Sequence, residues 1–114
     1  MKILLVDDSE DQLHLNIMVV EKEFPEAEII TADDGLNALK VFDDDIDLIL
    51  TDLQMPYVNG DELAQELRHR GSKVKIVLLS STPEDARNKE NFNLIMRKIL
   101  LVTDFHKIKE MYAS

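Results

Sequence analysis

Polar and charged side chains stand directly after several apolar runs of this sequence. Asp7 and Asp8 follow the first run, Asp52 and Ser80 follow two later ones, and Lys98 ends a candidate fifth run. In an open parallel sheet, ligands bind outside the carboxyl ends of the strands. If each run is a strand of such a sheet, we expect these five side chains to lie near one another at one edge.

Three carboxylates gathered at one edge repel one another, so either one stays protonated with a raised pKa or a hard cation neutralises them. Mg2+ is the natural cation, because it prefers oxygen ligands and is usually held by one or two carboxylates together with phosphate oxygens. A carboxylate can also attack phosphorus to give an aspartyl phosphate. We expect Asp52 to be that nucleophile, Lys98 to supply positive charge beside the metal, and the Ser80 hydroxyl to donate to a phosphoryl oxygen.

The elements that must position these side chains alternate between strands and helices. Short apolar runs predict strands at residues 2–6, 27–31, 46–51 and 74–79. Helical spacing predicts helices from Ser9 to Pro25, from Gly35 to about Val41, around Leu63 and Leu67 up to Gly71, and from Thr103 or Asp104 to Met111 or Tyr112. Connections too long for hairpins imply right-handed crossovers, so we expect a doubly wound, flavodoxin-like α/β fold with a five-stranded parallel sheet and helices on both faces.

The region after the fourth predicted strand allows two interpretations. In the first, a fifth strand lies within residues 93–102, Lys98 reaches the site, and the helix before this strand is shortened or lost. In the second, Pro83 starts a helix that runs to about Met96, and Lys98 begins a strand at residues 99–102 and points away from the site.

Composition indicates one acidic domain. With 114 residues, we expect 1–114 to form a single domain. Thirteen basic against 23 acidic residues give a net charge of −10, which argues against direct nucleic-acid binding through phosphate contacts. Residues 1–60 carry 15 acidic and 3 basic residues, which favours a cation there. No apolar run approaches the roughly 20 residues that cross a membrane, and the absence of cysteine excludes thiol chemistry and fits a cytoplasmic location.

Four pieces of the sequence, in this order and spacing, resemble the response-regulator receiver domains of two-component signalling, especially the single-domain chemotaxis type. They are Val-Asp-Asp-Ser at 6–9, Ala-Asp-Asp-Gly-Leu-Asn-Ala-Leu at 32–39, Leu-Thr-Asp-Leu-Gln-Met-Pro at 50–56 with Gly60, and Ile-Val-Leu-Leu-Ser at 76–80. The resemblance covers about the whole chain.

The resemblance implies that Asp52 is the phosphoacceptor and, with Asp8, a metal ligand. Asp7 would act on the metal through water, and the backbone carbonyl of Gln54 would be the remaining protein ligand. The implied phosphodonor is a histidine kinase, a histidine phosphotransfer protein or a small molecule, and the implied output is contact with a downstream protein. Such a chain is not a conventional enzyme, because it catalyses only its own phosphorylation and dephosphorylation.

The sequence also departs from this family. Receiver domains usually have proline directly after the site lysine and often an aromatic residue three positions before it, but here Ile99 and Ile95 hold these places. The 18 positions from Ser80 to Lys98 are fewer than is usual. These departures favour an alternative function, a receiver-like interaction module that works without phosphorylation, and the intact Asp52 opposes it.

Other functions fit the residues less well. A phosphatase of the haloacid-dehalogenase type should have Asp-x-Asp after its first strand, but Ser9 holds the third place. A flavin protein should have a Ser/Thr/Gly-rich phosphate loop there, where this chain has acids.

Some of the polar residues also have purely structural explanations. Asp8 alone could interact favourably with the positive end of the following helix, and Ser80 alone could satisfy a backbone group. The acidic run at 43–47 lacks the glycine and spacing of a calcium loop, and the three histidines share no ligand spacing, so we expect both to be solvated surface.

Overall fold

The computed structural model describes residues 1–98 and 102–113. Along these residues the elements are β1 (Lys2–Val6), α1 (Glu10–Glu23), β2 (Glu28–Ala32), α2 (Gly35–Val41), β3 (Leu48–Thr51), α3 (Gly60–His69), β4 (Lys75–Ser80), β5 (Leu94–Arg97) and α4 (Val102–Ala113). Two short 3-10 turns, η1 (Pro83–Asp85) and η2 (Lys89–Asn91), stand between β4 and β5. The predicted alternation of strands and helices is therefore confirmed.

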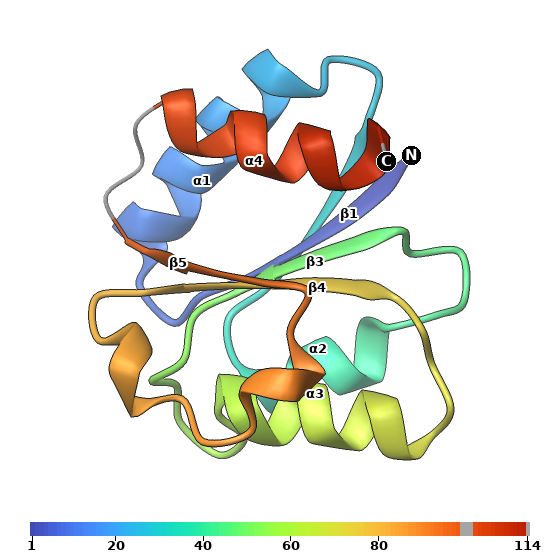
Figure 1. Ribbon diagram of the computed structural model, residues 1–114, viewed down its shortest axis with the longest axis vertical. Coiled ribbons are helices and arrows are strands. Elements are labelled where there is room, and N and C mark those ends of the chain that lie inside the picture. The colour runs from blue at the N-terminus through green and yellow to red at the C-terminus, as the bar shows by residue number, and fades with distance from the viewer. Residues whose placement is uncertain (99–101, 114) are drawn as a thin grey trace.

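The five strands form one parallel sheet in the order β2-β1-β3-β4-β5. Figure 1 shows α1 and α4 on one face of the sheet and α2 and α3 on the other. The chain winds outward from β1 to β2 and then returns past β1 to β3, so the strand order reverses between β1 and β3. This is the doubly wound fold that the sequence predicts. In such folds ligands bind at the carboxyl ends of the strands between which the order reverses, and we call this place the crevice.

The register of the sheet brings the predicted site residues to one level. Val6 pairs with Thr51, so Asp7 and Asp52 are the next residues along two neighbouring strands. Ser80 pairs with Arg97 at the end of the sheet, and the backbone N–H of Lys98 donates to the carbonyl of Ser80 at 2.9 Å. The ends of four strands therefore bring Asp7, Asp52, Ser80 and Lys98 to the same edge.

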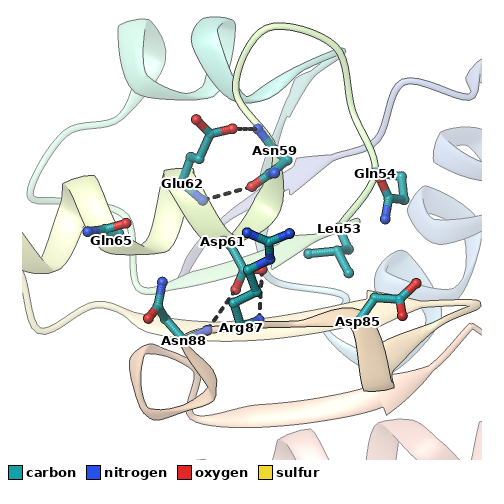
Figure 2. Close-up of a pocket in the computed structure, with 9 residues that line it drawn as sticks. All are labelled: Leu53, Gln54, Asn59, Asp61, Glu62, Gln65, Asp85, Arg87 and Asn88. Carbon is teal, nitrogen blue, oxygen red and sulfur yellow. Dashed lines mark hydrogen bonds between the residues drawn. The ribbon is translucent and has the colours of Figure 1, made fainter.

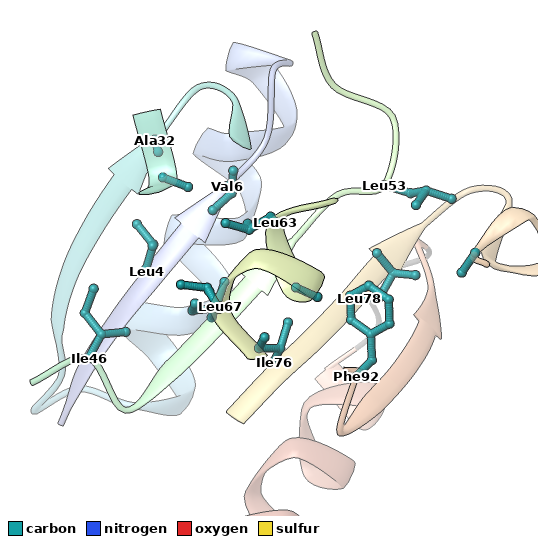
Figure 3. Packing of buried hydrophobic residues seen from close by; sticks show 14 residues of the cluster. Leu4, Val6, Ala32, Ile46, Leu53, Leu63, Leu67, Ile76, Leu78 and Phe92 are labelled. Atoms are coloured by element: carbon teal, nitrogen blue, oxygen red, sulfur yellow. The ribbon is translucent and has the colours of Figure 1, made fainter. Parts of the chain in front are cut away.

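The hydrophobic core has two layers because the central strands are buried on both faces. Along β1, Leu4 and Val6 point to the side of α2 and α3, whereas Ile3 and Leu5 point to the side of α1 and α4. Figure 3 shows the first layer, in which Leu63 and Leu67 of α3 pack over β1 and β4. The apolar side chains of both layers pack the helices against the strands whose ends carry the site.

Local signals set the helix ends where the sequence predicts them. The Ser9 hydroxyl accepts the Gln12 N–H at 3.3 Å and caps α1, and Phe24 ends that helix before Pro25. Gly71 has φ +87°, the left-handed conformation expected of a glycine just beyond a helix. The boundaries shift slightly elsewhere, since β2 lies one residue later than predicted and α4 begins at Val102 rather than after Thr103 or Asp104.

The region between β4 and β5 decides between the two interpretations of the sequence. The helix predicted from Pro83 to about Met96 is wrong, because η1, η2 and β5 occupy these residues. The expected shortening of the helix between the fourth and fifth strands is confirmed, since only single 3-10 turns stand there. The strand of the second interpretation falls largely on residues 99–101, which lie outside the described residues.

Candidate functional site

Asp7 is held firmly at the end of β1. Its side chain is 1% exposed, and its Oδ1 accepts the backbone N–H of Ser9 at 2.9 Å. Its own N–H donates to the carbonyl of Ala32 at the end of β2. The next residue, Asp8, is exposed. The two acids therefore differ in exposure, because Asp7 is buried at the end of the strand and Asp8 is open to solvent.

Asp52 is fixed by backbone bonds on both sides. Its N–H donates to the carbonyl of Val6 at 3.0 Å, which ties it to β1, and its Oδ1 accepts the N–H of Leu53 at 2.8 Å. The residue is only 9% exposed. The second carboxylate oxygen, Oδ2, is left to face the crevice.

Lys98 enters the crevice from the end of β5. Its Nζ lies 2.8 Å from Oδ2 of Asp7 and 3.2 Å from Oδ2 of Asp52. The lysine side chain is 15% exposed, so this is a largely buried ammonium between two buried carboxylates. The structure thus places Lys98 in the site, as the first interpretation predicts, although no proline follows it.

Burial and charge act against each other in this cluster. Burial raises the pKa of Asp52; Lys98 offsets this rise only in part, and the nearby Asp7 carboxylate adds to it. Burial also opposes the charge of Lys98, but hydrogen bonds and attraction from both carboxylates outweigh it, and the pKa of Lys98 is raised. The ammonium therefore stays charged at neutral pH and is the internal counterion of the site.

The three carboxylates meet closely enough to hold one cation. Asp7, Asp8 and Asp52 each offer an oxygen, and these atoms lie within 4.8 Å of one another. The donor set consists of carboxylate oxygens only, the ligands that a hard dication such as Mg2+ prefers. Within residues 1–98 and 102–113, this is the cluster of three metal-ligating side chains that the structure brings together. The residues present therefore fit the predicted metal.

Two other predicted site residues lie at the same edge. Ser80 is 1% exposed at the end of β4, and its hydroxyl oxygen accepts the N–H of Thr82 at 3.0 Å, which leaves its proton available for donation. Gln54 is exposed two residues beyond Asp52. The roles expected of the Ser80 hydroxyl and the Gln54 carbonyl stay predictions.

The three histidines and the acids of the run at 43–47, which we expected to be solvated surface, lie at the surface. His14, His69 and His106 are all exposed. In the acidic run at 43–47, Asp43 is paired with Lys2 at 2.9 Å and accepts the N–H of Asp45.

Two residues of α3 that the sequence did not single out prove to be structural anchors. Asp61 is 7% exposed, and its carboxylate accepts the N–H groups of Arg87 and Asn88 at 3.0 and 3.3 Å (Figure 2). Arg68 donates to the carbonyls of Val74 and Asn91 at 2.7 and 3.1 Å. An acid in the first turn of a helix and an arginine near its end are common for reasons of the helix dipole alone. The sequence therefore carries no signal of their contacts.

A polar groove runs beside α3, close to the crevice. Its volume is about 770 Å3. Figure 2 shows side chains from three segments around it. Its lining residues are Leu53, Gln54, Asn59, Asp61, Glu62, Gln65, Asp85, Arg87 and Asn88. The groove thus lies between the segment that follows Asp52 and the segment that joins β4 to β5.

Comparison with known proteins agrees with this geometry. The response regulator receiver domain family matches residues 3–110. A relative in Haemophilus influenzae, described as a homologue of the transcriptional regulatory protein CpxR, is 37% identical over 84 residues, which are 74% of this chain and 36% of that protein. The first curated relatives are all longer, and this chain spans about a third of their length or less.

Solved structures share the fold over nearly the whole chain. A receiver domain protein from Clostridium thermocellum has a TM-score of 0.84 at 23% identity, covering 98% of this chain and 94% of that one. The response regulator TrrA from Thermotoga maritima, solved in complex with Mg2+ and BeF, has a TM-score of 0.78 at 27% identity, covering 96% and 97%. This chain belongs to the response regulator receiver domain family of two-component signalling. Among the described residues, no helix combines the length and apolar character that a membrane span requires.

Proposed function

We propose that this chain is a phosphoacceptor receiver in which Asp52 takes a phosphoryl group from a phosphohistidine donor. The observation that carries the proposal is the ammonium of Lys98 set between Asp7 and Asp52, at 2.8 and 3.2 Å, within a cluster of three carboxylates. Lys98 supplies positive charge where the phosphoryl oxygens would lie, and the buried walls keep its position fixed. Phosphoryl transfer needs mainly such positioning and charge.

The residues divide the reaction among themselves. An oxygen of the Asp52 carboxylate attacks phosphorus, a P–O bond forms, and the P–N bond of the donor breaks as the imidazole nitrogen leaves with the electron pair. Lys98 binds a phosphoryl oxygen, and the Ser80 hydroxyl donates to another. Asp7, Asp8, Asp52 and the carbonyl of Gln54 would hold Mg2+, which when bound neutralises charge on the transferring group. Attack of water on the same phosphorus later returns Asp52 to a free carboxylate and releases phosphate.

The partners proposed for this receiver follow from that reaction. Its donor is a histidine kinase or a histidine phosphotransfer protein, and its output is a change in contacts with a downstream protein. The balance of 13 basic and 23 acidic residues opposes direct binding of nucleic acid by residues 1–114. We place such a receiver in the cytoplasm, where kinases of this kind present their phosphohistidine.

Mass spectrometry after incubation with Mg2+ and acetyl phosphate tests the proposal. We expect the wild type to gain one phosphoryl group and Asp52→Asn to gain none. Asp44→Asn is the matched control, because it removes the same charge from an exposed acid outside the site and leaves the gain unchanged. Wild-type protein that stays unmodified and does not bind Mg2+ would contradict the proposal.

That negative result would favour a second function, a receiver-like module whose contacts do not depend on phosphate. The observation in its favour is the remodelled region between β4 and β5, where η1 and η2 replace a helix and Ile95 holds the place of an aromatic residue. The module would keep the acid cluster and its lysine as a structural ion pair only.

A further inference from the structure

The first turn of α3 touches the segment that carries Asp52. The N–H of Gly60 donates to the carbonyl of Leu53 at 2.9 Å. A side-chain carbon on Gly60 would lie 2.4 Å from the carbonyl oxygen of Asp52, so the backbones approach this closely only because residue 60 is glycine. The start of α3 is therefore in direct backbone contact with the segment of Asp52 and Leu53.

The next residue of α3 grips a different segment. The Asp61 carboxylate accepts the N–H groups of both Arg87 and Asn88, which lie between η1 and η2 (Figure 2). Because Asp61 is 7% exposed, these two bonds replace the water that a carboxylate would otherwise bind. One turn of helix thus joins the phosphoacceptor segment to the connection between β4 and β5.

Arg68 fastens the other end of that connection to the same helix. Its guanidinium donates to the carbonyl of Asn91 at 3.1 Å and to the side-chain oxygen of Asn93 at 3.0 Å. Arg68 stands two helical turns after Asp61, so the two side chains hold the connection at two points along α3. The connection, which has no α-helix of its own, is therefore packed as an attachment of α3.

We propose that the first turn of α3 is a relay that couples the state of Asp52 to the connection between β4 and β5. The proposal rests on the function proposed above and adds a route for its regulation. The relay starts at the bond from the N–H of Leu53 to Oδ1 of Asp52, at 2.8 Å. It continues through the bond from Gly60 to Leu53 and ends at the grip of Asp61 on Arg87 and Asn88.

The chemistry of Asp52 gives the relay its direction. A free carboxylate is a strong acceptor because it carries a full negative charge. When Asp52 takes a phosphoryl group, that charge moves to the phosphoryl oxygens and the bond from Leu53 weakens. Leu53 and Gly60 then shift together, and the hold of Asp61 on the connection loosens. The groove changes shape at the same time, because Leu53 and Asp61 both line it.

Amide hydrogen exchange measures the relay directly at its far end. Beryllofluoride with Mg2+ stands in for the phosphoryl group on Asp52. We expect its addition to speed exchange at the N–H groups of Arg87 and Asn88 by about five-fold, the lower end of typical coupling between sites. Since coupling between two sites is reciprocal, Asp61→Asn, which weakens the grip, should bind beryllofluoride about five-fold more tightly than the wild type.

Glu62→Gln is the matched control for this variant. It removes one negative charge from the same helical turn, but glutamine still accepts the N–H of Asn59 and preserves the cap of α3. We expect its affinity for beryllofluoride to equal that of the wild type. If both variants gain affinity equally, the effect is one of net charge and the relay is wrong.

The outcomes separate the relay from the proposed function. If the wild type binds beryllofluoride but exchange at Arg87 and Asn88 does not change, the relay is wrong and the function stands. If the wild type does not bind beryllofluoride at all, the proposed function and the relay both fall. Should Asp61→Asn fail to fold, the exchange rates of the wild type still decide, because that measurement needs no variant.

Discussion

Two connections leave the same edge of the sheet, and they are built in opposite ways. The connection after β3 leads into α3, a ten-residue helix with a complete capping box between Asn59 and Glu62. The connection after β4 has only η1 and η2, and neither turn has a side-chain cap at its start. The first connection caps its own helix, whereas the second relies on side chains of α3 as partners for some of its backbone groups.

The second connection obtains these side chains from the first. Asp61 and Arg68 of α3 take up backbone N–H and carbonyl groups that a helix would have paired within itself. Every buried backbone polar group needs a partner. A crossover between parallel strands can therefore lack a helix when charged side chains of a neighbouring helix lie within hydrogen-bond distance of its backbone. The site at the sheet edge stays intact, since the ends of the strands do not depend on that helix.

The largest effect should come from removing the arginine on which the second connection depends. Arg68→Ala leaves the carbonyl of Asn91 in the second connection without its donor, together with those of Ser72 and Val74 just before β4, so we expect a loss of about 3 kcal/mol in the free energy of unfolding. Urea unfolding gives the value. Arg70→Ala is the control, since its exposed ion pair with Glu66 is worth about 0.5 kcal/mol or less. Equal losses in the two variants would remove the contrast between the connections.

Neutralising the first residue of the other connection should stabilise the protein. Burial raises the pKa of Asp52 despite Lys98, so the charged carboxylate opposes folding at neutral pH. We expect Asp52→Asn to add about 1 kcal/mol at pH 7 in metal-free buffer, because the raised pKa means that the charged form costs free energy in the folded state, and Lys98 keeps Asp7 as its partner. Urea unfolding over a range of pH checks this expectation.

The pH dependence of that gain follows from linkage. The folded-state pKa of Asp52 is raised above its unfolded value, so the wild type loses stability as the pH rises from that unfolded value through the folded pKa. The gain of Asp52→Asn is full above this window and vanishes below a pH of about 4, where Asp52 is protonated in both states. A gain that persists at low pH would have another cause.

A smaller gain should come from the strained residue of the first connection. Tyr57 has φ +68° and is 81% exposed, an unfavourable backbone conformation for a tyrosine without burial to offset it. Asparagine adopts this region readily, so Tyr57→Asn should add about 0.5 to 1 kcal/mol to the free energy of unfolding. Tyr57→Ala removes the same ring but keeps the strain, and thermal melting should show the gain for asparagine only.

The smallest effect should lie at the outer surface of the second connection. Arg97 donates to the carbonyl of Ser81 and pairs with Glu84 at 3.2 Å, but both side chains of the pair are more than half exposed. A double-mutant cycle of Arg97→Gln and Glu84→Gln should give a coupling of about 0.3 kcal/mol that disappears in 1 M salt. A coupling as large as the effect of Arg68→Ala would mean that the connection is held from β5 rather than from α3.

The sequence predicted the elements and most of the site because these features have local causes. Strand ends follow from apolar runs, and parallel pairing then brings Asp7, Asp52 and Ser80 to one edge whatever the details of the loops. The position of Lys98 depends on where the last strand lies, which the sequence left open between two interpretations. In the structure β5 ends one residue before Lys98.

The anchors of the second connection could not be predicted, because their partners are backbone groups. Asp61 binds N–H groups 26 and 27 residues later in the chain. Because nearly every residue has a backbone N–H, the residue types at these positions do not indicate the contact. The left-handed Tyr57 was missed for a similar reason, since the sequence shows a tyrosine where a glycine or asparagine would have indicated the turn. The cap of α1 was predictable although its partner is also a backbone group, because Ser9 and the N–H of Gln12 are only three residues apart.

The ammonium of Lys98 gives the crevice a resident cation before any metal arrives. The ammonium already contacts Asp7 and Asp52 and offsets the repulsion between their charges. The two carboxylates can therefore lie close together without a bound metal ion. A divalent cation would find the carboxylates already gathered. It would share the oxygens of Asp7 and Asp52 with the ammonium of Lys98. For the receiver proposed above, changes in Mg2+ concentration should therefore alter how often Asp52 can react, while the fold of the domain stays the same.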